Sequence, residues 1–140
     1  MTIPMNDAVW QDLVDINREV NRKITYRIDA QNHPQLPVPE QWNVLLEGGY
    51  GDCDDYAATK RHFLRNRYPQ HHDHFRLATC WVDAGRTAGS YHAVLIVETD
   101  QGAYVLDNNL RRPILMEDVN YAWHKIEDPR SPTGWSRITL

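Results

Sequence analysis

The chain has 140 residues, a length that suits one domain with a single hydrophobic core. Apolar residues make up 41% and the formal net charge is −4, so we expect a folded domain over residues 1–140 that does not bind nucleic acid. No apolar run is long enough to span a membrane, and residues 1–10 lack the basic and apolar parts of a signal peptide. These features predict a cytoplasmic protein, or a periplasmic one if the sequence was trimmed. They leave its oligomeric state open.

The first half of the chain has the apolar spacing of helices. Val9, Leu13 and Val20 share one stripe of an amphipathic helix, and three prolines favour an extended loop downstream. The predicted elements are a helix over residues 8–23, a strand over 24–29, a loop over 30–40, a short helix over 41–47 and a long helix over 53–67. A solvated loop over residues 70–74 follows this helix, because Pro69 stops it.

The second half reads mainly as strands. The predicted strands cover residues 75–83, 91–98 and 103–107, with a turn over 84–90 and an edge strand over 136–140. The 91–98 segment is apolar on both faces, which is typical of a central strand. Between these elements the C-terminal part has no clear periodicity and is expected to be irregular, with Trp123 and Trp135 packed onto the domain.

A glycine-rich turn leads directly into the second long helix, whose first turn contains Cys53. Gly49 and Gly51 permit a sharp change of direction, and the apolar pattern after Cys53 turns its side chain toward the protein body. Unpaired N–H groups and the helix dipole stabilise a thiolate at such a position. The other cysteine, Cys80, lies within a predicted strand, so we expect a buried structural residue and no disulfide.

His92 and Asp107 are brought together by the predicted hairpin. Pairing across the turn at residues 99–102 puts the start of one strand beside the end of the next. If the Cys53 helix packs across this sheet, a Cys–His–Asp arrangement results, with Cys53 as nucleophile, His92 as base and acid, and Asp107 orienting the ring. The plainer alternative is a core histidine satisfied by a neighbouring side chain.

Three acidic residues, Asp52, Asp54 and Asp55, surround the cysteine. Acidic side chains in a first helical turn often only complement the helix dipole. Here they also repel a thiolate and raise the pKa of the thiol, a conflict that a bound cation would remove. Carboxylates with backbone carbonyls suit Ca²⁺ better than zinc, so calcium is a possible cofactor.

Three segments together resemble the bacterial transglutaminase-like cysteine peptidases, the group that includes an adhesin-releasing periplasmic protease. They are Gly51-Asp52-Cys53-Asp54-Asp55-Tyr56-Ala57-x-x-Lys60, Tyr91-His92-Ala93-Val94-Leu95 and Tyr104-Val105-Leu106-Asp107-Asn108. The segment from Val20 to Asp29 is also similar. The resemblance covers about residues 9–125 and implies an α+β, papain-like fold with N-terminal helices on an antiparallel sheet. It further implies a Cys53–His92–Asp107 triad and a calcium site that uses Asp52 and Asp54, with Asp55 as a further candidate.

The leading hypothesis is therefore a cysteine peptidase or amidase that cleaves a peptide-like amide through a thioester, with the Cys53 backbone N–H in the oxyanion hole. A transglutaminase would differ only in using an amine in place of water. The alternatives are a non-catalytic peptide- or protein-binding module on the same fold and a hydrolase of peptidoglycan peptides. The sequence does not identify the second oxyanion donor or the substrate.

Overall fold

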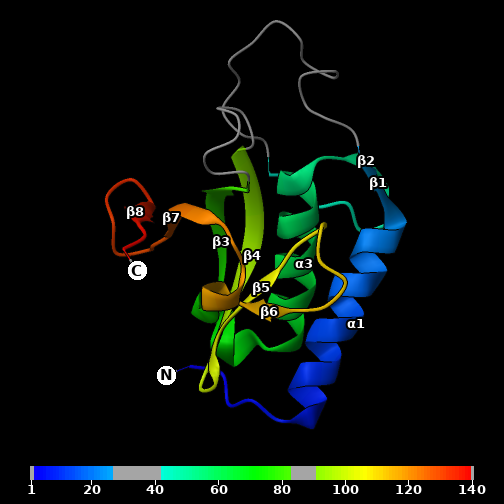
Figure 1. Ribbon diagram of the computed structural model, residues 1–140. Coiled ribbons are helices and arrows are strands. Elements are labelled where there is room, and N and C mark those ends of the chain that lie inside the picture. The colour runs from blue at the N-terminus through cyan, green and yellow to red at the C-terminus, as the bar shows by residue number, and fades with distance from the viewer. Residues whose placement is uncertain (1, 27–41, 83–90, 140) are drawn as a thin grey trace, which may run out of the picture.

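A computed structural model describes residues 2–26, 42–82 and 91–139, and its elements are shown in Figure 1. They run in the order α1 (Asp7–Lys23), β1 (Ile24–Tyr26), β2 (Gly49–Gly51), α3 (Cys53–Arg67), the 3-10 helix η1 (Pro69–His74), β3 (Phe75–Trp81), β4 (Tyr91–Thr99), β5 (Gly102–Leu106), β6 (Ile114–Leu115), the 3-10 helix η2 (Met116–Asp118), β7 (Ala122–Glu127) and β8 (Trp135–Arg137). Helices α1 and α3 lie side by side against a sheet, which confirms the α+β class.

The main sheet has six antiparallel strands in the order β6-β5-β4-β3-β7-β8. Its centre follows the predicted register, with Leu95 opposite Leu106 and Val97 opposite Tyr104. Strand β4 is central, as its two apolar faces predicted. Strands β1 and β2 form a separate parallel pair beside the start of α3.

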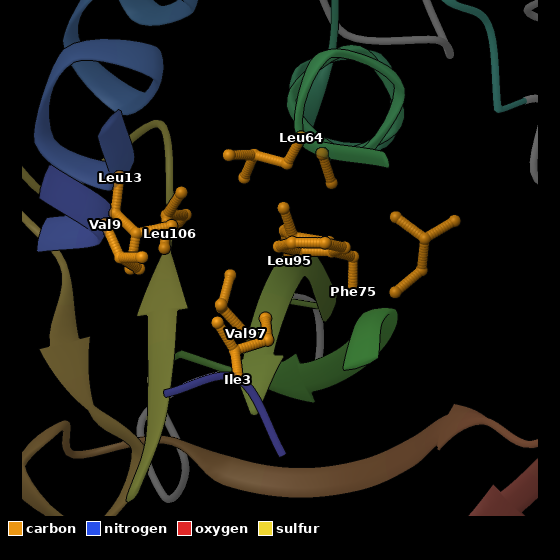
Figure 2. Packing of buried hydrophobic residues seen from close by; sticks show 10 residues of the cluster. Ile3, Val9, Leu13, Leu64, Phe75, Leu95, Val97 and Leu106 are labelled. Carbon is orange, nitrogen blue, oxygen red and sulfur yellow. The ribbon is translucent and has the colours of Figure 1, made fainter. Parts of the chain in front are cut away.

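One face of the sheet packs against the two helices. Leu13 of α1 and Leu64 of α3 are fully buried against Leu95 of β4 and Phe75 of β3 (Figure 2). The amphipathic pattern of α1 accounts for this contact, because Val9, Leu13 and Val20 are all buried. This packing holds α3, and therefore the segment around Cys53, against the middle of the sheet.

The other face is covered by the C-terminal part of the chain. Val94 and Ile96 of β4 pack there against Tyr121 and Trp123, while Trp135 packs against the helix side. The prediction of an irregular C-terminal part was wrong for residues 122–127, which form β7 and pair with β3. The edge strand predicted near the C-terminus is present as β8.

Two further local predictions differ from the structure. Residues 42–47 are not helical, because the backbone N–H groups of Asn43 and Leu45 are bound by the side chains of Asp55 and Thr59 on α3, at 3.1 Å and 2.8 Å. The segment predicted as a solvated loop over 70–74 forms η1 instead. Residues 27–41, which include the end of the predicted strand over 24–29 and the whole predicted loop over 30–40, and residues 83–90, which include the predicted turn over 84–90, lie outside the described residues.

No helix in the described part of the chain is both long and apolar enough to cross a bilayer.

Candidate active site

A capping box begins α3 and places Cys53 at its first helical position. The Asp52 side chain accepts a hydrogen bond from the Asp54 N–H at 3.2 Å, and Asp55 accepts one from the Asp52 N–H at 3.1 Å. Gly51 is required immediately before this turn, since an added Cβ would lie 2.9 Å from atoms of Asp55 and Leu45. The local sequence therefore fixes where the thiol emerges.

Among the described residues, the Cys53 thiol has two hydrogen-bond partners. Its Sγ lies 3.7 Å from Asp54 Oδ1, and it accepts a hydrogen bond from the backbone N–H of Ala93. Burial and the negative charges of Asp54 and Asp52 raise the pKa of Cys53 far above its usual range, and the Ala93 N–H opposes this rise only in part. Burial and these two carboxylates therefore favour the neutral thiol, and they outweigh the expected stabilisation of a thiolate by the helix dipole.

His92 and Asp107 form a buried pair. His92 Nε2 lies 2.6 Å from Asp107 Oδ1, and their side chains are 7% and 0% exposed. Burial raises the pKa of Asp107, but hydrogen bonds from His92, from the Tyr121 hydroxyl and from the Asn109 N–H outweigh it and hold that pKa below its usual range. The prediction that the hairpin joins these two side chains is confirmed.

Helix α3 packs on the sheet, as the triad argument required, and the Cys53 thiol contacts β4 through the Ala93 N–H. Helix α3 packs on the face of β4 that carries Leu95 and Val97, whereas His92 contacts Tyr121 on the opposite face, with ring centroids 6.1 Å apart. Pairing between β4 and β5 ends at Leu95, so the Ala93 N–H is available to bind Sγ at the open edge. Within the described part of the chain, Sγ makes no hydrogen bond to the His92 ring.

The three acidic residues around Cys53 do not act alike. All three are buried, but both oxygens of Asp55 accept backbone N–H groups, from Asn43 and Asp52. Among the residues that the structure describes, no group of three His, Cys, Asp or Glu side chains converges as a metal site. Asp55 is therefore a capping residue here, while Asp52 and Asp54 flank the thiol.

Sequence analysis missed two residues near Asp107. Tyr121, just before β7, donates its hydroxyl to Asp107 Oδ2. Lys60 of α3 is completely buried, and its Nζ lies 2.8 Å from Asn17 Oδ1. Burial lowers the pKa of Lys60 to about 7, although the nearby Asp107 charge raises it. The sequence signals for Lys60 were a polar residue on the apolar stripe that begins at Cys53 and its place in the segment that resembles the family, and neither gave it a role.

Comparison with protein families gives one match over the whole chain. The sequence pattern of the family described as bacterial transglutaminase-like cysteine proteinase, BTLCP, matches residues 1–140. No curated protein matches the sequence.

Comparison with solved structures finds LapG of Legionella pneumophila. The EGTA-treated form is 17% identical with a TM-score of 0.68, and the alignment covers 94% of this chain and 68% of that one. The calcium-bound form is 16% identical with a TM-score of 0.66, over 94% and 72% of the two chains. At this identity the likeness shows the fold alone, and it agrees with helices packed on an antiparallel sheet.

Proposed function

The chain belongs to the bacterial transglutaminase-like cysteine proteinases, and we propose that it hydrolyses a peptide-like amide with Cys53, His92 and Asp107 as its triad. The observation that carries the proposal is the buried His92–Asp107 pair, with the thiol bound to the N–H of the next residue, Ala93. The family accounts for the class of enzyme, a cysteine peptidase, whose substrates are proteins or peptides.

The contacts support a role for each residue. Asp107 holds Nε2 of His92, which leaves Nδ1 to take the proton from the Cys53 thiol. The thiolate then attacks the amide carbon, and the carbon–sulfur bond forms as the carbonyl electron pair moves onto oxygen. When the carbonyl re-forms, the carbon–nitrogen bond breaks and His92 gives its proton to the leaving amine. Water then cleaves the thioester, with His92 as base.

Asp54 competes with His92 for the thiol in the resting protein. It lies 3.7 Å from Sγ, and its charge is one of the causes that raise the pKa of Cys53. Asp52 and Asp54 fit a hard cation, because they are buried carboxylates in a stretch that also offers backbone carbonyls. We propose that both bind Ca²⁺, whose charge would offset theirs, and a calcium-bound LapG structure supports this. Asp55 does not fit, since both its oxygens are engaged in capping.

The triad is tested by the rate at which iodoacetamide alkylates Cys53 and by hydrolysis of dye-labelled casein at pH 7. With calcium added to offset the Asp52 and Asp54 charges, we expect alkylation in the wild type faster than that of free cysteine, a loss of about 10² to 10⁴ in the hydrolysis rate for His92→Ala, and no hydrolysis for Cys53→Ala. Alkylation as slow as that of free cysteine, and equal in His92→Ala, would show that His92 does not activate the thiol.

Calcium is tested separately, by titration calorimetry of the wild type and of Asp52→Asn and Asp54→Asn. We expect heat of binding in the wild type and a loss of affinity of tenfold or more in each variant. The Asp7→Asn variant is the control and should keep its calcium affinity, because Asp7 lies in the first turn of α1, away from the proposed ligands, and removes the same charge. No binding heat in the wild type would refute the calcium site and leave the triad proposal standing.

A further inference from the structure

Tyr26 is held beside the nucleophile by the small β1–β2 sheet. Its register partner is Gly51, two residues before Cys53. Its ring stacks on Tyr56, one helical turn after Cys53, with centroids 6.3 Å apart and planes 28° apart. Tyr56 is itself fixed, since its hydroxyl donates to the Ile24 carbonyl at 2.8 Å. The Tyr26 ring is therefore tethered, through backbone and side chain, over the first turn of α3.

The surroundings of Tyr26 suit a hydrogen-bond donor that faces a substrate. Half of the residue is exposed, at 50%, although its ring is stacked on a buried neighbour. Burial raises its pKa, and the nearby Cys53, Asp52 and Asp54 raise it further, so the phenol keeps its proton. Apolar packing does not account for a tyrosine held this firmly with so much of it in solvent.

Amide cleavage at Cys53 needs donors for the oxygen that becomes negative when sulfur attacks. One is the Cys53 backbone N–H, which stands at the first position of a 15-residue helix and has no acceptor in the described part of the chain. In the first turn of α3 the neighbouring N–H groups are already engaged, because the Asp54 N–H is bound to Asp52 and the Asp55 and Tyr56 N–H groups are bound to the Asp52 carbonyl. The second donor therefore comes from outside the first turn of α3, and a nearby side chain can provide it.

We propose that the Tyr26 hydroxyl is the second oxyanion donor of this enzyme. The proposal rests on the proposed function, because it presumes attack by Cys53. The phenol donates a hydrogen bond to the substrate carbonyl oxygen, and this bond strengthens as charge develops there. No proton is transferred from Tyr26, so the hydroxyl returns unchanged when the tetrahedral intermediate collapses. Strand β1 thereby has a catalytic role in addition to its pairing with β2.

Two reagents separate oxyanion stabilisation from activation of the thiol in the full-length chain. p-Nitrophenyl acetate acylates sulfur through a tetrahedral oxyanion, and its leaving group needs no proton. Iodoacetamide alkylates the same sulfur by displacing iodide, with no oxyanion. Tyr26→Phe keeps the ring and its stack on Tyr56 while removing the hydroxyl. Tyr50→Phe is the matched control, since Tyr50 lies on the adjoining strand and is 61% exposed.

We expect Tyr26→Phe to slow acylation by about 10²-fold, the usual effect of losing one oxyanion donor, and to leave alkylation within about twofold of the wild type. Tyr50→Phe should match the wild type with both reagents. Unchanged acylation in Tyr26→Phe overturns the proposal. An equal slowing of both reactions also overturns it, because the hydroxyl would then affect the reactivity of the thiol and not the oxyanion. If the wild-type protein reacts with both reagents no faster than the Cys53→Ala protein does, the proposed function fails and this proposal fails with it. Melting curves of the three proteins confirm that each variant is folded.

Discussion

At the scale of single residues, the charge on Asp107 depends on neighbours that the motif does not contain. The carboxylate accepts hydrogen bonds from the His92 ring, the Tyr121 hydroxyl and the Asn109 N–H. Its own backbone carbonyl accepts one from Asn21 of α1, at 3.1 Å. These contacts tie the end of β5 to β4, to α1 and to the segment before β7. Asp107 is thus positioned by three other parts of the chain and by the N–H of Asn109 just after it.

Tyr121→Phe should weaken this arrangement in a pH-dependent way. The depressed pKa of Asp107 means that its stabilising effect is fully present above its unfolded pKa of about 3.9 and is lost as pH falls through the lower folded value. Removing the hydroxyl raises the folded pKa, so we expect a loss of about 1–2 kcal/mol in the free energy of unfolding at pH 7. Urea denaturation of the wild type and of Tyr121→Phe at pH 7 and at pH 3 measures this difference in the free energy of unfolding.

The difference between Tyr121→Phe and the wild type should shrink as the pH falls below the unfolded pKa and the folded Asp107 carboxylate takes up its proton. A difference that is equal at both pH values would mean that the hydroxyl contributes packing or a neutral hydrogen bond, and not stabilisation of the charge. The phenylalanine ring preserves the edge contact with His92, so the variant isolates the hydroxyl.

At the scale of elements, the start of α3 is set by its capping box. Asp55 links the helix to the glycine turn through the Asp52 N–H and to the preceding segment through the Asn43 N–H. One residue therefore fixes both the helix start and the chain leading into it. The same contacts explain why Asp55 is not one of the proposed calcium ligands, although it is adjacent to Asp54 in sequence.

Asp55→Ala should destabilise the protein by about 1–2 kcal/mol, because a buried cap is lost and two backbone N–H groups lose their acceptor. Thermal unfolding measures the effect. The control is Asp7→Ala in the first turn of α1, where Asn6 is the capping residue and Asp7 contributes only its charge. If both variants lose the same small amount, Asp55 acts through the helix dipole and not as a cap.

At the scale of the whole molecule, Glu127 joins elements that are far apart in sequence. Its side chain pairs with Arg61 of α3 and accepts the Leu77 N–H of β3 at 2.7 Å, while its carbonyl accepts from Arg76 at 2.8 Å. The helix, the centre of the sheet and β7 therefore meet at one partly buried residue. This junction holds the C-terminal strands against the part of the sheet that supports the site.

Glu127→Gln should lower the free energy of unfolding by about 1–3 kcal/mol, because it leaves the partly buried Arg61 without its counter-charge. Asp15→Asn is the control, since its pair with Arg18 is exposed and should contribute less than about 1 kcal/mol. Urea denaturation of the two variants distinguishes them. Equal losses would indicate that the junction is held by backbone pairing alone.

Local patterns in the sequence predicted most of the helices and strands and one of the contacts in the site. Apolar spacing predicted α1, α3, β3, β4 and β5, because each buries a continuous stripe or face, and the short turn after β4 determined its register with β5. That register alone predicted the contact between His92 and Asp107. β7 was missed because all its residues are half-buried and show no alternation.

Only the tertiary structure decided the surroundings of the thiol. Sequence spacing could not tell which face of β4 the helix would cover, nor that Cys53 would reach the Ala93 N–H at the open edge of β4. The burial of Cys53 and the position of the Asp54 carboxylate beside its sulfur determine whether Cys53 is a thiol or a thiolate. Both depend on the packing between α3 and β4. Local pattern did not give the roles of Tyr26, Tyr121 and Lys60 for the same reason, since each contacts residues remote in sequence.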